Sequence, residues 1–322
     1  MRQRARFFAF FVLMAMGAAS QRAQAVNLTV NCDRHESLHK ALRLLATTNP
    51  QGPNKITVLG DCKGNFVIQS MDRLTLITKT GASITDRSKG NLAVLDVEDS
   101  RSVTLQGFTI NGGAQGIGIL CSTASVCYLT GNTIQGPGHF GVNVLRGSRA
   151  FLESNVIQNR GGRGSTVIGN SLMFSSNDVF QDNGGQGVAV IGGSHFEASN
   201  STFLNNGVGV EGFLNSTIRF HGGTISGSVC ASPTPFCGYG VVLLGGAQAS
   251  FANMTITANG GSGIHLEDGS FAVFFGTTVT GNLSGTDVEC APQFPITRFV
   301  AGTGGITNCV EPASKSQLKD LK

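Results

Sequence analysis

The stretch G-N-T-I-Q-G-P-G-H-F-G-V-N-V-L-R-G-S-R-A-F-L-E-S-N-V-I, residues 131–157, decides the fold, because it begins and ends on the same short phrase. G-N-T-I and S-N-V-I each place two turn-forming residues before two β-branched ones. The phrase recurs in variants that end at Ile110, Ile134, Ile157, Phe180, Phe203, Ile225, Ile256 and Val279. Successive anchors are 22 to 24 residues apart, except for one interval of 31. Such a period is typical of solenoids and propellers.

Each period consists of brief alternating runs that are separated by turns rich in glycine and asparagine. Residues seven and five before the anchor are apolar or small, as in Cys127 with Leu129 and Ala150 with Leu152. Glycine often stands seven residues after the anchor, as at Gly141. Alternation over four residues indicates a strand and is too short for a helix. Three strands and three turns in 22–23 residues predict an all-β, single-domain, right-handed parallel β-helix.

The interval of 31 residues contains the extra segment Cys230–Cys237, which is eight residues long. Once this segment is passed, Gly240 returns to the register of the other glycines. An insertion that loops out of a turn leaves the coil beneath it intact, so the irregular interval supports the solenoid.

Residues 1–25 resemble a signal peptide. Arg2, Arg4 and Arg6 precede an apolar run, and Ala23-Gln24-Ala25 resembles a cleavage site. The alternative is an uncleaved N-terminal anchor. We expect an exported protein that is secreted, periplasmic or on the cell surface, with no membrane insertion of the mature chain, because no later apolar stretch is long enough to span a bilayer.

Removal of residues 1–25 takes away four arginines and no acidic residue, which leaves 19 basic against 19 acidic side chains. A nearly neutral mature chain argues against nucleic acid as a partner. We expect a monomer.

The eight cysteines all follow the signal segment, and an even number in an exported chain indicates disulfides. Proximity along the chain favours the pairs Cys32–Cys62, Cys121–Cys127, Cys230–Cys237 and Cys290–Cys309. Sequence alone leaves the connectivity open. A zinc site is the rival interpretation, but the C-x2-C and histidine spacings of zinc sites are absent. We therefore expect no metal.

One segment has helical periodicity, with Leu38, Ala41, Leu42 and Leu45 on one face and Ser37 as its N-cap. A solenoid has to cover its terminal coil, because open strand edges invite aggregation. We predict an N-terminal cap of a helix and the first strand at 26–60, the β-helix at 61–283, and a C-terminal cap and tail at 284–322.

The chain resembles the pectate-lyase-like superfamily of right-handed parallel β-helix proteins in two features. One is the helix from Ser37 to Leu45 that leads to Ile56-Thr57-Val58, and the other is the pair of coil phrases quoted above. More narrowly, the chain is similar to exported bacterial β-helix repeat proteins without an assigned activity. The resemblance covers Asn31 to Cys309. The resemblance implies the fold, but it says little about catalytic or binding chemistry, because the shared residues form turns and core.

The superfamily includes polysaccharide lyases, polygalacturonases, pectin methylesterases and uronan epimerases, as well as tailspikes and adhesins without catalysis. Pectate lyases use a Lys or Arg base, and no lysine occurs between Gly90 and Ser314. Hydrolases of this kind use clustered aspartates, and only Asp178, Asp182 and Asp268 occur between Leu105 and Gly281. Asp178 stands where asparagine fills a turn in other coils. None of these chemistries carries over, and no cofactor is implied.

An outward-facing stripe remains, at the positions six and four before each anchor. It brings Glu197, Arg219 and His221 together as candidate catalytic residues, which could grip a sugar and move a proton. Beside them lie four candidate ligand-binding residues, Tyr128, Phe151, Phe174 and Glu153. The alternative is a surface ion pair worth about 0–1 kcal/mol.

Other histidines are less prominent in the pattern. His265 and Glu211 face outward on the next strand, on a surface that we interpret as too plain for catalysis. His139 and His195 fall at or near turns and are expected only to meet water.

Three functions stay open. The first is an exported β-helix protein that binds or presents to extracellular polysaccharide, without evident catalysis. The second is a divergent polysaccharide lyase, hydrolase or epimerase acting on an extended glycan. The third is a non-catalytic surface or adhesin-type protein whose rigid body presents its loops to a partner.

Overall fold

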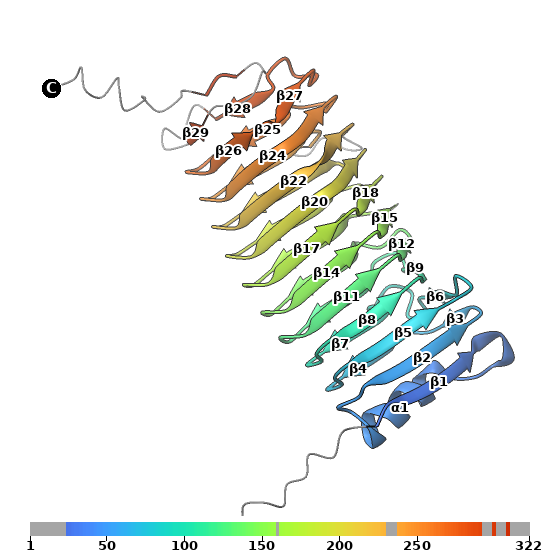
Figure 1. Cartoon of the computed structure of the whole chain (residues 1–322). Coiled ribbons are helices and arrows are strands. Elements are labelled where there is room, and N and C mark those ends of the chain that lie inside the picture. The colour runs from blue at the N-terminus through green and yellow to red at the C-terminus, as the bar shows by residue number, and fades with distance from the viewer. Residues whose placement is uncertain (1–23, 159–160, 230–236, 292–297, 301–306, 310–322) are drawn as a thin grey trace, which may run out of the picture.

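The computed structural model describes residues 24–158, 161–229, 237–291, 298–300 and 307–309. Consecutive coils stack side by side along one axis, from helix α1 (Leu38–Thr48) at one end to β29 (Arg298–Val300) at the other (Figure 1). All strand pairs in the two sheets are parallel, as predicted for a β-helix. The signal segment predicted at residues 1–25 falls almost entirely outside the described residues, so it stays a prediction.

A ten-stranded sheet takes one strand from each coil. Its strands run in chain order from one end of the stack to the other, with no crossing. They are β4 (Phe66–Gln69), β7 (Leu95–Glu98), β10 (Ile117–Ser122), β13 (Phe140–Leu145), β16 (Arg163–Ile168), β19 (Gln186–Ile191), β21 (Val208–Phe213), β23 (Val241–Leu244), β25 (Ile264–Leu266) and β28 (Val288–Cys290).

A 19-stranded sheet holds the other two runs of each coil. The first run gives β1 (Val26–Asn31), β2 (Asn54–Leu59), β5 (Leu74–Thr78), β8 (Val103–Gln106), β11 (Val126–Thr130), β14 (Arg149–Glu153), β17 (Leu172–Ser176), β20 (His195–Leu204), β22 (Thr217–Ser226), β24 (Gln248–Thr257), β26 (Phe271–Phe275) and β29. The second run gives β3 (Cys62–Lys63), β6 (Ser83–Thr85), β9 (Thr109–Asn111), β12 (Thr133–Gln135), β15 (Val156–Gln158), β18 (Val179–Gln181) and β27 (Thr278–Thr280). In β20, β22 and β24 the two runs join into one ten-residue strand.

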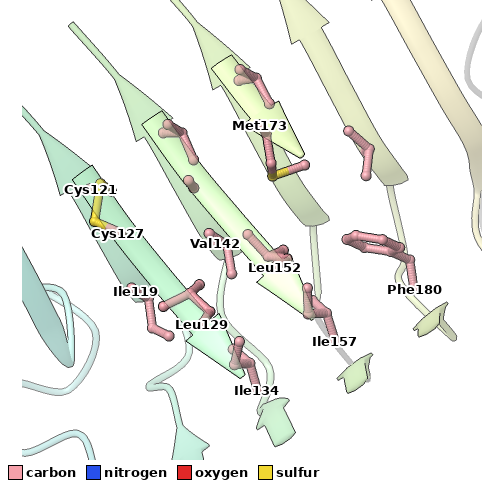
Figure 2. Close-up of a cluster of buried hydrophobic side chains, with 14 of the residues drawn as sticks. Ile119, Cys121, Cys127, Leu129, Ile134, Val142, Leu152, Ile157, Met173 and Phe180 are labelled. Atoms are coloured by element: carbon pink, nitrogen blue, oxygen red, sulfur yellow. A yellow bond between two sulfur atoms is a disulfide. The ribbon is translucent and has the colours of Figure 1, made fainter. Parts of the chain in front are cut away.

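The core is a set of rows in which equivalent inward side chains of consecutive coils touch. Leu129 lies beside Leu152, and Ile134 beside Ile157, as their strand registers require (Figure 2). Farther along the axis, the rings of Phe180 and Phe203 stack with centroids 5.0 Å apart. Burial of one such side chain stabilises the fold by about 1.5–3 kcal/mol, so each coil contributes its own share of core.

The N-terminal end is covered as predicted, with one addition. Helix α1 begins after Ser37, whose Oγ accepts from the backbone N of Lys40, and it buries Leu38, Ala41, Leu42 and Leu45. The short 3₁₀ helix η1 (Cys32–Arg34) precedes it. The addition is β1, a strand before the helix that pairs in parallel with β2. Beyond residue 283, β28 and β29 continue the two sheets, so the predicted boundary of a C-terminal cap stays a prediction.

Three predicted disulfides are present: Cys32–Cys62, Cys121–Cys127 and Cys290–Cys309. Cys121 and Cys127 are completely buried, and their bond spans the turn between β10 and β11. Cys237 is also disulfide-bonded, and its predicted partner Cys230 lies outside the described residues. Within the described ranges, no helix has the length and apolar character needed to cross a membrane.

Ladders of polar side chains tie the turns of consecutive coils together. The Asn132 backbone N and side-chain Nδ2 both donate to Asn155 Oδ1, at 2.9 and 3.0 Å. Asn155 makes the same pair of bonds to Asp178 Oδ1, at 2.7 and 2.9 Å. Asp178 therefore fills the turn role that its position in the phrase indicated. A second ladder of this kind joins Asn183 to Asn206.

The glycines at the second position of the strands of the ten-stranded sheet from β13 to β21, and the equivalent Gly240, are explained by the close approach of adjacent backbones. A Cβ built on Gly187 would lie 2.6 Å from the carbonyl oxygen of Gly209, and one on Gly164 would lie 2.5 Å from that of Gly187. Equivalent contacts of 2.3–2.4 Å occur at Gly141, Gly209 and Gly240. Because the obstacle is backbone, no rotamer change relieves it, and these five positions of the column admit only glycine.

We predict that Gly187→Ala lowers the thermal midpoint by several degrees, because forcing an extra methyl group into a packed backbone costs about 1–3 kcal/mol. Differential scanning calorimetry measures the change. Gly260→Ala is the matched control, since the nearest atom to its added Cβ is a carbonyl oxygen 3.2 Å away. Equal midpoints for the two variants would contradict this explanation of the column.

Asp178 also predicts a pH dependence. Burial raises the pKa of its carboxyl, although hydrogen bonds from Ser175, Asn155 and Ser176 oppose the shift. The folded state then holds the proton more tightly than the unfolded chain, so the ionised carboxylate destabilises the fold as the pH rises above 3.8 through the raised pKa.

We therefore expect Asp178→Asn to unfold at a higher temperature than the parent at neutral pH, with the difference shrinking as the pH falls toward 3.8. The amide keeps an oxygen for the two bonds from Asn155. Thermal midpoints across the pH range measure the effect. A variant that is less stable than the parent at neutral pH would show that the charge is well accommodated.

Candidate functional site

The predicted aromatic residues form a ladder on the outer face of the 19-stranded sheet. Tyr128 and Phe151 stack with ring centroids 5.0 Å apart and planes 12° apart, and Phe151 and Phe174 stack at 5.1 Å and 8°. Because each ring face is covered by the next ring, the ladder presents mainly ring edges to solvent. It therefore offers less flat surface to a sugar than three separate exposed rings would.

The predicted charged cluster lies at the end of this ladder. His195 Nε2 is 3.6 Å from Glu197 Oε2, and His221 Nε2 is 3.6 Å from Glu197 Oε1. Arg219 is the strand neighbour of Glu197 and is exposed to solvent. Among the described residues, the ion-pair partners of Glu197 are the two histidines.

The prediction for His195 was wrong. Instead of meeting only water near a turn, it begins β20, contacts Glu197, and has its ring centroid 6.1 Å from that of Phe174. Glu153, the fourth candidate ligand-binding residue, is exposed on β14 beside Thr130 and Ser176. This face can form polar contacts, but its side chains are open to solvent and their ion pairs are weak.

The outer face of the ten-stranded sheet carries a different arrangement, which we call the recessed row. It runs along the axis with one residue from each strand from β7 to β28: Asp96, Leu120, Asn143, Thr166, Ala189, Glu211, Val242, His265 and Glu289. Although these side chains point away from the core, Thr166 is 4% exposed and Ala189 is completely inaccessible.

The central residues of the recessed row are inaccessible because these small side chains lie between larger ones, whereas Asp96, Glu211 and Glu289 are half-buried. On one side is the apolar row, which consists of Leu145, Ile168, Ile191, Phe213 and Leu244. Ile168 and Phe213 in this row are 36% and 37% exposed. On the other side lie Phe140, Arg163 and Gln186, which precede the recessed row by three residues in their strands.

Glu211 of the recessed row has two polar partners on neighbouring strands. Its Oε2 accepts a short hydrogen bond from Gln186 Nε2 and lies 4.0 Å from Arg163 Nη2. Burial raises the pKa of Glu211, and the positive charge of Arg163 and the bond from Gln186 partly oppose this. Arg163 Nε also donates to Gln186 Oε1 at 2.8 Å, so the three side chains hold one another in place.

A second polar cluster lies two coils farther along the row. His265 Nε2 is hydrogen-bonded to Glu267 Oε2 at 3.1 Å, and its Nδ1 lies 3.4 Å from Glu289 Oε2. Ser262 Oγ donates to Glu289 Oε2 at 2.7 Å. Burial raises the pKa of the Tyr239 phenol, and the nearby Glu289 carboxylate raises it further.

Toward the other end of the row, three buried polar atoms have no hydrogen-bond partner among the described residues: Asp96 Oδ1, Asn143 Oδ1 and Thr166 Oγ1. Burial, followed by repulsion from Glu98, raises the pKa of Asp96 to about 6. Buried polar atoms without partners are rare in folded proteins, and perturbed carboxyls concentrate at functional sites.

The surface around Glu211 and His265 is thus more polar and more buried than its sequence pattern indicated, while our interpretation that it is too plain for catalysis stays untested. The sequence showed that these residues point outward, but the long-range packing that makes them inaccessible cannot be read from alternation. One signal was available: residues 145, 168, 191, 213 and 244 are apolar at outward-facing positions, which a plain solvated face would not require. Among the described residues, no group of three or more His, Cys, Asp or Glu side chains could hold a metal ion.

The pKa of Asp96 gives a direct prediction. Carbon-13 NMR titration of the side-chain carboxyl should show a midpoint near 6, and Glu98→Gln should lower this midpoint because it removes the like charge. Glu153→Gln, on the other sheet, serves as the control and should leave it unchanged. A midpoint at the ordinary value of 3.8 would mean that the recessed row is hydrated.

The sequence matches one protein-family model, described as the right handed beta helix region, over residues 78–225 and 162–300. No curated protein matches the chain. Among solved structures, the A-module of mannuronan C-5 epimerase AlgE6 from Azotobacter vinelandii aligns with a TM-score of 0.58 at 13% identity, over 81% of this chain and 79% of that one.

Two further structures share the architecture. The AlgE4 A-module from the same organism has a TM-score of 0.56 at 14% identity, over 79% of this chain and 76% of that one. The enzymatically active domain of bacteriophage CBA120 tailspike protein 2 has a TM-score of 0.53 at 12% identity, over 79% and 38%. At these identities the likeness establishes the fold alone.

Proposed function

The chain belongs to the right-handed β-helix family, and we propose that it is an exported protein that binds an extended polysaccharide along the recessed row of the ten-stranded sheet. The observation that carries the proposal is that the half-buried carboxyls of Asp96, Glu211 and Glu289 share one row with polar atoms of Asp96, Asn143 and Thr166 that have no hydrogen-bond partner among the described residues. Sugar hydroxyls are suited to these atoms, because each hydroxyl both donates and accepts.

The shape of the surface supports an elongated ligand. Coils of a β-helix repeat about every 4.8 Å, so the recessed row presents equivalent positions along many coils. The apolar row beside it provides a dry wall for the C–H groups of sugar rings, while Arg163 and Gln186 provide polar contacts opposite. A largely apolar surface with a few fixed polar groups is typical of ligand sites.

The neighbouring structures are consistent with such a ligand. Two of them are named as epimerases of mannuronan, a polysaccharide, and they share the architecture over most of both chains. Export is supported by the disulfides, which persist in oxidising compartments. A secreted, periplasmic or surface location therefore forms part of the proposal.

A second candidate function is catalysis on the same polymer, as a divergent lyase, hydrolase or epimerase. The observation that favours it is the raised pKa of Glu211, since a carboxyl with a raised pKa can act as a general acid near neutral pH. We place binding first because the Glu211 carboxylate is already engaged by Arg163 and Gln186.

Binding to the other outer face is the competing location. There Glu197, Arg219 and His221 would contact the polymer beside Tyr128, Phe151 and Phe174. These roles stay predictions, and the same experiment distinguishes the two faces.

We predict that the oxidised protein without residues 1–25 binds at least one polymer in a panel of soluble neutral, amino and acidic polysaccharides. Glu211→Gln should weaken that binding about tenfold, equivalent to about 1.4 kcal/mol, because it alters the side chains that line the row. Isothermal titration calorimetry measures the affinity. Glu197→Gln is the matched control, the same chemical change on the other face, and should leave the affinity nearly unchanged.

Other results would change the account. Absence of binding to every polymer would refute the proposed function. Binding lost in the Glu197→Gln/Arg219→Ala double variant but retained in Glu211→Gln would move the site to the 19-stranded sheet. Depolymerisation or epimerisation that disappears in Glu211→Gln would establish the enzyme instead.

A further inference from the structure

The charge of the ten-stranded sheet is strongly one-sided. Its strands contain the carboxylates of Asp96, Glu98, Glu211 and Glu289, a single guanidinium at Arg163 and one imidazole at His265. All of these side chains lie on the outer face, since the inward positions are apolar or small. The face that would receive the ligand is therefore acidic, even though the chain without residues 1–25 is nearly neutral.

The residues at the ends of these strands do not reverse the imbalance. The residue directly after β7 is Asp99, and the one after β25 is Glu267. Only Arg146, directly after β13, adds a positive charge in the same position on another strand. Arg163 offsets only the charge of Glu211, which it contacts, and leaves Asp96, Glu98 and Glu289 in excess.

The buried atoms that have no hydrogen-bond partner among the described residues also favour a ligand that carries hydrogen-bond donors. In its ionised form the Asp96 carboxyl can only accept hydrogen bonds, and Asn143 Oδ1 is an acceptor as well. A ligand that satisfies them must supply donors. Ammonium and hydroxyl groups do so, whereas the carboxylate of a uronic acid supplies acceptors and a like charge.

We propose that the ligand of the recessed row is a polysaccharide carrying amino groups, and that polyuronates are excluded by the acidic face. This inference rests on the proposed function. It separates the protein from its structural neighbours named for mannuronan, which is a polymer of a uronic acid. Electrostatic complementarity of this kind sets specificity between otherwise similar polymers.

The test compares three oligomers of the same length with the full oxidised protein. These are glucosamine oligomers, N-acetylglucosamine oligomers of the same linkage, and mannuronate oligomers. Calorimetry at about pH 6 keeps sugar amines largely protonated and the mannuronate carboxylates ionised, and it keeps Asp96, with its pKa of about 6, about half ionised. We expect the glucosamine oligomer to bind about tenfold more tightly than its N-acetylated form, with a preference that declines as salt is added, and no binding of the mannuronate oligomer.

The Asp96→Asn/Glu98→Gln double variant should lose about fivefold in affinity for the glucosamine oligomer and leave the N-acetylated form nearly unaffected. Its folding is not at risk, because it removes the repulsion between two like charges. Equal binding of the amino and N-acetylated oligomers would overturn the inference, as would tighter binding of mannuronate. If either result is accompanied by loss of binding in the Glu211→Gln variant, the proposed binding site on the recessed row still stands and only the inference about amino groups is overturned. Absence of binding to all three oligomers and to the wider polysaccharide panel overturns both proposals.

Discussion

The structure depends on one constraint, the exact stacking of each coil on the previous one. Parallel backbone hydrogen bonds, the asparagine ladders and the glycine column all join a residue to its equivalent about 23 positions along the chain. A shift of one residue would turn every inward side chain of a coil outward. The 31-residue interval shows how the constraint is met, because its extra residues leave the registers of β22 with β24 and of β21 with β23 unbroken.

The same stacking creates the candidate site. Since equivalent outward residues form rows, a series of small side chains between two series of larger ones becomes a recessed line along the axis. Asn143, Thr166 and Ala189 are buried for this reason, although they lie on the outer face of the sheet. Burial then raises the pKa values of Asp96 and Glu211, so the unusual electrostatics follow from the geometry of the rows.

The fold was readable from the sequence because its signals are local and repeated. Anchor spacing, inward and outward alternation, the Ser37 cap and the turn role of Asp178 each depend on residues within one coil or its neighbour. The site was harder to predict from the sequence. The Glu197 cluster follows from strand register alone, whereas the burial of Glu211 and His265 depends on the sizes of the side chains in the neighbouring rows. Strand β1 was missed because its pattern lies outside the repeat, before the helix.

The central claim is that ligand binds on the recessed face of the ten-stranded sheet. Hydroxyl-radical footprinting with mass spectrometry, with and without a bound polysaccharide, tests it directly, because both outer faces carry exposed and reactive side chains. The account predicts protection of Phe213 and Ile168, which line the recessed row, and unchanged labelling of Tyr128 and Phe151. Protection of Tyr128 and Phe151 with Phe213 and Ile168 unchanged would contradict it and place the ligand on the other sheet.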